Sequence, residues 1–258
     1  MNDLLARMMQ AADVTQGWLW VAALVFLRVG AAVFLMPGFG EQSVPQRVRL
    51  VVALALSAIV TPAAAPLLQD LPSIPLAAAI EVVAGLMLGI GMRLFILALQ
   101  MAASIVAQTT SLSQMFGGAT PEPQPAIGNL LTMVGIALAL RAGLHVKAVS
   151  LLILSYTFLP AGHLPTPSDV ADWGKGQVVQ ATVLSFSLAA PFVIASVIYN
   201  LALGVINRAM PQMPVSMVGA PVLTAGALVL MAMMVPLLLT VWMEGFDAFL
   251  ANPLRLTR

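Results

Sequence analysis

Three ionisable side chains interrupt otherwise apolar segments of this sequence: Arg28, Glu81 and Arg93. A charge inside an apolar segment is costly unless it is paired or hydrated, so such residues are candidates for function. Arg28 and Glu81 lie deepest and have opposite signs, which fits an interhelical ion pair or a proton relay. We favour the ion pair, because proton-driven carriers usually contain more buried acidic residues. Arg93 lies near a segment end, where a long side chain can reach water.

Catalytic and metal-binding patterns are absent from the sequence. Its two histidines, His145 and His163, lie in or near predicted loops and have no partner at ligand spacing. There is no cysteine, which excludes thiol catalysis and cysteine-ligated metals. Neither a Gly-x-Ser-x-Gly motif nor a phosphate-binding loop occurs. We therefore predict no catalytic residues, no metal and no cofactor.

The most unusual stretch is 101–126. It contains a polar run at 108–114, followed by Gly117-Gly118 and by a Pro-Glu-Pro-Gln-Pro sequence that should end any helix. Irregular backbone occurs at membrane depth only inside protein or along a watery cavity. We expect a broken polar element here; the alternative is a loop outside the membrane.

The elements that position these residues must be membrane helices. Of the 258 residues, 60% are hydrophobic and only 8% are charged, with a net charge of +1, whereas a typical soluble domain is about 25% charged. This composition excludes an ordinary soluble enzyme, a disordered chain and a nucleic-acid-binding protein. The apolar runs are 18–36, 48–68, 74–100, 127–140, 144–160, 178–206 and 215–243. We predict an all-α polytopic integral membrane protein built from helical hairpins.

Two spacings predict how the helices pack. Gly85 and Gly89 lie on one face of the third apolar run, which favours the close approach of another helix. The turn at 207–214 contains Asn207, Arg208, Pro211 and Gln212 between the two longest apolar runs, and it predicts a helical hairpin. We therefore divide the chain near residue 175, into a first part at 1–175 and a hairpin at 176–258.

Loop charges give a predicted orientation in the membrane. Loops at 37–49, 141–147 and 207–214 are basic, whereas those at 69–75, 117–126 and 161–177 are acidic. The alternation requires residues 101–116 to return across the structure as a hairpin arm. The basic loops are then cytoplasmic, and both termini face the other side. The charges at Asp3, Arg7 and Asp13 do not fit a cleavable signal.

The sequence resembles the flagellar biosynthesis protein FliR family and its counterpart in virulence-type type III secretion. The match consists of short segments that occur in the same order along the chain, and the segments between Ala190 and Gln212 are the most specific. The matching residues are Leu27-Arg28-Val29, Met36-Pro37-Gly38-Phe39, the run from Ser43 to Arg49, Glu81, Gly85, Gly89, Gly91, the run from Ala142 to His145, Ala190-Pro191, the run from Asn200 to Gly204, Asn207-Arg208 and Pro211-Gln212.

This resemblance implies a subunit of a protein export gate in the bacterial inner membrane, within the flagellar basal body. Such a subunit joins FliP-like and FliQ-like subunits, works with an FlhB-like protein and passes unfolded export substrates. The first part would resemble FliP and the hairpin would resemble FliQ. The motifs favour a flagellar over a virulence-type system, and the family implies no enzymatic activity.

The resemblance also gives residues 104–126 a role, because this region contributes a pore plug in the family. Carried over by position, the plug would comprise Gln108, Thr109, Ser111, Ser113, Met115, Phe116, Gly117 and Gly118. The sequence departs from the family's Gln-x-Gly and Asp-Pro pattern here, so the plug is inferred rather than its individual contacts. The family's cytoplasmic hairpin turn matches 207–214 and would face the FlhB-like partner.

Two other functions are weighed beside the export gate. A secondary transporter or permease for a small substrate would use Arg28 and Glu81 near the membrane midplane and the broken 101–126 element as binding backbone. An assembly scaffold without a pore-lining role would tolerate changes in the plug but not in the hairpin.

Overall fold

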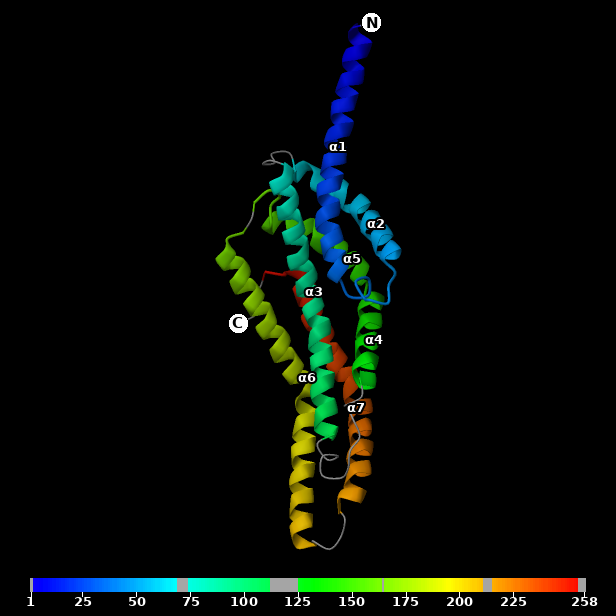
Figure 1. The fold of residues 1–258 in the computed structure, drawn as a ribbon, viewed down its shortest axis with the longest axis vertical. Coiled ribbons are helices and arrows are strands. Elements are labelled where there is room, and N and C mark those ends of the chain that lie inside the picture. Colours follow the sequence, from blue (N-terminus) through cyan, green and yellow to red (C-terminus); the bar gives the residue numbers. More distant parts are fainter. Residues whose placement is uncertain (1, 69–73, 112–124, 164, 211–214, 255–258) are drawn as a thin grey trace. The chain divides into compact units, whose positions relative to one another are not determined.

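The computed structural model describes residues 2–68, 74–111, 125–163, 165–210 and 215–254. Within these ranges the chain is helical and has no strand (Figure 1), which confirms the predicted all-α class. The elements are α1 (Asn2–Leu35), α2 (Gln46–Ala64), the short 3-10 helix η1 (Ala65–Leu67), α3 (Ile74–Ser111), α4 (Pro125–Arg141), α5 (Leu144–Phe158), α6 (Pro167–Ala209) and α7 (Val215–Ala251).

Several of these helices are membrane spans by length and composition. Among the described residues, the five that qualify alone are Gly17–Leu35, Gln46–Leu67, Pro75–Thr109, Pro167–Ala209 and Ala225–Ala251. The pair α4 and α5 is interrupted where Gly143 adopts a φ of 82°, and the two helices qualify together as one broken span. The chain is therefore a polytopic membrane protein, as predicted.

One expectation about α3 is wrong. Residues 101–111 continue α3 as a single helix to Ser111, so they do not return as a hairpin arm. The polar side chains near this end bond to their own helix: the Ser104 hydroxyl donates to the carbonyl of Gln100, and that of Thr109 to the carbonyl of Val106. The helix thus includes the first residues of the polar run, whose hydroxyl groups are satisfied by its own backbone.

The chain forms two compact units. The first comprises Met1–Arg93, Leu140–Lys175 and Phe249–Leu256, and the second comprises Leu94–Ala139, Gly176–Ala248 and Thr257–Arg258. One boundary falls after Lys175, within α6, and others fall within α3, α4 and α7, so four helices contribute to both units. The division into sequential parts at 1–175 and 176–258 stays a prediction.

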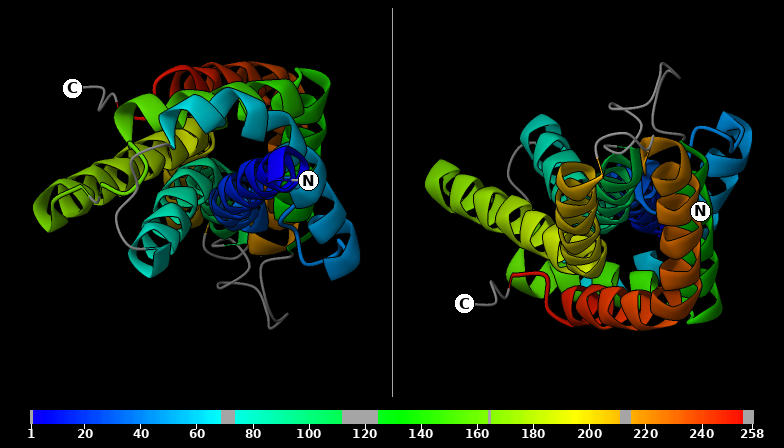
Figure 2. Two further views of the ribbon diagram at one scale, coloured as in Figure 1. Left: turned by 90° about the horizontal axis from the view of Figure 1, so that it is seen from above. Right: turned by 90° about the horizontal axis from the view of Figure 1, so that it is seen from below.

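In the first unit, α1 packs along α2 (Figures 1 and 2). Val25, Val29 and Ala32 recur every three or four residues on α1, Met36 follows directly after its end, and all four are buried, as expected for one face of a helix against a core. Arg28 lies on this same face. The helical spacing therefore carries a charged side chain into the interior of the unit.

The second unit has an aromatic centre. The indole of Trp242 on α7 is fully buried, and its nitrogen donates to the carbonyl of Phe95 at 2.8 Å. Phe246 stacks on Trp242 and lies 5.2 Å from the Phe95 ring, centroid to centroid. Within this unit, α6 and α7 run in opposite directions (Figure 1), as predicted for a hairpin.

Candidate functional site

The candidate site is a buried ion pair in the first unit. The Arg28 Nε donates to Glu81 Oε2 at 2.7 Å, and a terminal nitrogen of Arg28 donates to Glu81 Oε1 at 3.0 Å. Both side chains are 0% exposed. The two parallel hydrogen bonds match the planar guanidinium to both oxygens of the carboxylate, the strongest geometry for such a pair. The interhelical pair considered from the sequence is therefore present, between α1 and α3.

Helix α5 completes the surroundings of the pair. Arg28 donates to the Ser155 hydroxyl at 2.9 Å and to the Leu159 carbonyl at 3.0 Å. The Leu159 carbonyl follows the last turn of α5, where backbone carbonyls lack helical partners. Arg28 therefore bonds to two groups near the end of α5 as well as to its carboxylate.

Tyr156 contacts both members of the pair. Its hydroxyl donates to Glu81 Oε2 at 3.2 Å, and the Arg28 guanidinium carbon lies 3.8 Å from the centre of its ring. The ring supplies a cation–π contact and covers the guanidinium from water. Three helices thus meet at one point through polar bonds inside an apolar unit.

Glycines bring α3 close enough to α1 for this contact. A Cβ atom at Gly85 would collide with the Arg28 carbonyl oxygen and would lie 2.9 Å from the Ala31 Cβ. At Gly89 it would lie 2.9 Å from the Leu35 Cβ. The close packing predicted from Gly85 and Gly89 is confirmed. Gly85 lies one helical turn after Glu81. Its lack of a side chain lets α3 approach α1 closely enough for Glu81 to reach Arg28.

The third charge singled out in the sequence has a different partner. Arg93 forms an ion pair with Glu41, in the loop after α1, and the two side chains are 27% and 22% exposed. This pair lies in partial contact with solvent and is therefore weaker than a buried one. Arg93 belongs to the same unit as Arg28 but is not part of the buried network.

The buried network can do little chemistry. The guanidinium and the carboxylate bond to each other and to neighbouring residues of α5, so neither is available to bind a substrate. The described residues contain no cluster of three His, Cys, Asp or Glu side chains that could hold a metal. The Nδ1 atom of His163 lies 3.2 Å from the carbonyl oxygen of Ala161, two residues earlier in the same loop. The arrangement suits a fixed contact that holds three helices together.

The predicted plug lies partly within the described residues. Gln108 is exposed on α3, Thr109 is buried, and Ser111 is the last residue of the helix. The remaining predicted plug residues, Ser113, Met115, Phe116, Gly117 and Gly118, lie outside the described residues. In the predicted hairpin turn, Asn207 and Arg208 are exposed in the last turn of α6, while Pro211 and Gln212 lie outside the described residues.

Sequence reasoning missed the contribution of α5. Ser155 and Tyr156 are adjacent polar residues near the end of an apolar run, and this was a usable signal for a polar partner of Arg28. The Leu159 carbonyl left no such signal, because any residue type supplies a carbonyl. Glu41, the partner of Arg93, was assigned only to a basic loop.

Comparison with known proteins assigns the chain to a family. A family model described as bacterial export proteins, family 1, matches residues 19–249. The chain is 34% identical over 245 residues to the flagellar biosynthetic protein FliR of Caulobacter vibrioides, which covers 93% of this chain and 98% of that protein. It is 28% identical to FliR of Escherichia coli over 86% of each chain. FliR of Aquifex aeolicus is 26% identical over 88% of this chain and 89% of its own.

Proposed function

This chain belongs to the FliR family of bacterial export proteins, and we propose that it forms, with FliP-like and FliQ-like subunits, the gate through which unfolded flagellar substrates leave the cytoplasm. The resemblance seen in its motifs is confirmed, and the chain is a membrane protein of flagellar export. The partners, the plug and the inner-membrane location belong to the proposal.

The observation that carries the proposal is the exposed apolar surface of the hairpin. On α6, large apolar side chains are exposed from Val178 to Ile206, a rise of about 42 Å at 1.5 Å per residue. The hydrocarbon core of a bilayer is about 30 Å thick. On α7, only 17% of the 18-residue window that marks Ala225–Ala251 as a membrane span is buried within the chain. Lipid alone would leave part of this surface in water, so protein partners are needed to cover it.

The plug is the second part of the proposal. The end of α3 carries polar residues, and the sequence that follows is rich in glycine and proline. A segment of this composition inside a pore would close it through small and polar groups, and Met115 and Phe116 would exclude water. We propose that opening displaces this segment at Gly117-Gly118. The hairpin turn at 207–214 would contact the FlhB-like partner from the cytoplasm.

A small-molecule transporter that uses Arg28 and Glu81 receives little support from the geometry. Both side chains are fully buried, and their hydrogen bonds are made to each other and to α5. A substrate would have to displace an ion pair whose two side chains are both fully buried. The export gate requires no catalytic group and no cofactor, and none is assigned in the proposal.

Photo-crosslinking tests which molecules cover the hairpin. A crosslinking amino acid at Leu201 or Ile198, both exposed on α6, should capture the FliP-like or FliQ-like subunit when the export genes are expressed together. Ser168, exposed at the other end of α6, is the matched control and should give neither product. Adducts to lipid alone at Leu201 and Ile198 would contradict the proposal.

A further inference from the structure

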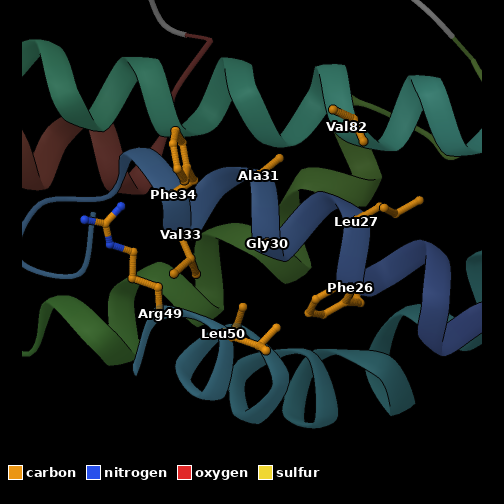
Figure 3. A pocket seen from close by; sticks show the side chains of 10 residues that line it. Phe26, Leu27, Gly30, Ala31, Val33, Phe34, Arg49, Leu50 and Val82 are labelled. Atoms are coloured by element: carbon orange, nitrogen blue, oxygen red, sulfur yellow. The ribbon is translucent and has the colours of Figure 1, made fainter. Parts of the chain in front are cut away.

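The first unit contains an apolar groove between α1 and α2, closed on one side by α3 (Figure 3). Phe26, Gly30 and Phe34 of α1 line it together with Leu50 of α2 and Val82 of α3. Its cavity volume is about 340 Å³. A Cβ atom built on Gly30 would meet no atom within 4 Å, so the space beside this glycine is open. Both walls belong to segments that qualify as membrane spans.

A single cation lines this groove. Arg49 lies in the first turn of α2, and its guanidinium carbon is 5.8 Å from the centre of the Phe34 ring. Its side chain is fixed by main-chain oxygens: Nε donates to the Val44 carbonyl at 3.1 Å, and a terminal nitrogen donates to the Glu41 carbonyl at 2.5 Å. The backbone therefore holds the guanidinium in place without neutralising its charge.

The carboxylate nearest to Arg49 in the sequence, that of Glu41, is paired with Arg93, and that of Glu81 is paired with Arg28. Arg47, two residues before Arg49, is exposed and does not line the groove. The groove is thus apolar along its length and positively charged at one end.

We propose that the groove binds an anionic phospholipid, with an acyl chain between α1 and α2 and the headgroup phosphate at Arg49. The cation lies near the helix end, at the level where headgroups meet the hydrocarbon, and basic pockets between membrane helices bind anionic headgroups. A cavity of this volume is in the range of small-ligand sites. A second helix, about 10 Å across, does not fit such a space. The inference goes beyond export and needs no partner subunit.

Native mass spectrometry of the detergent-purified full chain tests this site with phosphatidylglycerol and phosphatidylcholine as probes. We expect phosphatidylglycerol to be retained preferentially. Arg49→Gln should weaken its binding about fivefold, because it removes the guanidinium that lines the groove and is placed at the headgroup phosphate. Arg47→Gln removes the same charge from the same helix but outside the groove lining, and it should leave binding within about twofold of the original. Inorganic phosphate should not displace the lipid.

A second pair of variants tests the acyl-chain part of the site. Gly30→Leu fills the groove and should reduce the binding of both lipids. Gly17→Leu, on the same helix and also free of contacts within 4 Å of a Cβ, should not. Melting temperatures within a few degrees of the parent establish that all variants fold. Equal binding of both lipids, equal effects of Arg49→Gln and Arg47→Gln, or retention of lipid by a folded Gly30→Leu variant would overturn the proposal.

Discussion

Arg28 and Glu81, 53 residues apart in the sequence, join α1 to α3 through two parallel hydrogen bonds from which water is excluded. The same guanidinium bonds to Ser155 and to the Leu159 carbonyl at the end of α5. One arginine thus links three helices that are far apart in the chain. The network is placed to fix the arrangement of these helices, and its charges are not available for transport.

Breaking this pair on one side should be strongly destabilising. Arg28→Gln leaves a buried carboxylate and Glu81→Gln leaves a buried guanidinium, and each should cost about 3–5 kcal/mol. The double variant Arg28→Met with Glu81→Met leaves no buried charge, so it should be more stable than either single variant. Thermal unfolding of the detergent-purified protein measures this order.

The control is Arg93→Gln, which breaks the partly exposed pair with Glu41 and should cost less than about 1 kcal/mol. Swimming motility distinguishes a structural role from a proton relay. A double variant that folds and still supports motility fits a structural pair. Single variants with unchanged melting temperature but no export would instead indicate a relay.

Gly85→Ala should disrupt the contact between α1 and α3. The new methyl group would collide with the Arg28 carbonyl and the Ala31 side chain, so we expect a loss of about 1–3 kcal/mol. Gly17→Ala, on an open face of α1, should be neutral or stabilising by up to about 1 kcal/mol, because alanine favours the helix. The melting temperatures of the two variants measure the difference; a Gly85→Ala protein as stable as the Gly17→Ala protein would contradict the packing described here.

The sequence was sufficient for the main architecture and for the centre of the site. Charges in apolar segments identified Arg28 and Glu81, and the four-residue spacing of Gly85 and Gly89 identified the helix face that meets α1. Both signals arise because a membrane interior makes an unpaired charge costly and a close contact dependent on small residues. Such constraints are visible in the residue types themselves.

Two features that could not be predicted from the sequence depend on hydrogen bonds from side chains to backbone carbonyls. The polar run around Thr109 suggested that residues 101–116 leave α3 as a hairpin arm, but the Thr109 hydroxyl bonds to the Val106 carbonyl and the helix continues to Ser111. The Leu159 carbonyl bonds to Arg28 only because α5 ends there. Neither contact depends on a residue pattern that could be recognised before the helix ends were known.

Single cysteines should establish the orientation of the chain. Because the sequence has no cysteine, Arg47→Cys, Arg208→Cys and Ser168→Cys each introduce the only thiol. A membrane-impermeant maleimide should label Ser168→Cys in cells with a permeable outer membrane, and Arg47→Cys and Arg208→Cys only after lysis. With α3 as one span and α4 and α5 as one broken span, Arg47 and Arg208 lie on one side of the membrane and Ser168 on the other, and basic loops remain cytoplasmic. Labelling of Arg47→Cys and Ser168→Cys from the same side would refute this orientation.

Removing the proposed plug should make the assembled gate leak. Deletion of 109–118, or Gly117→Pro, should raise the permeability of the membrane to small ions, which conductance measurements on the reconstituted complex detect. The complex must first be shown to retain all its subunits. An intact complex with unchanged permeability would favour a scaffold without a pore-lining role, in which changes to the hairpin abolish assembly while changes to the plug are silent.

The central claim is that this chain is one subunit of a hetero-oligomeric export gate, and native mass spectrometry tests it most directly. The tagged protein should be expressed with its chromosomal neighbours and extracted in detergent. We predict one copy of this chain in a larger complex with FliP-like and FliQ-like subunits. A monomer or homo-oligomer, with those neighbours present but unbound, would contradict the account.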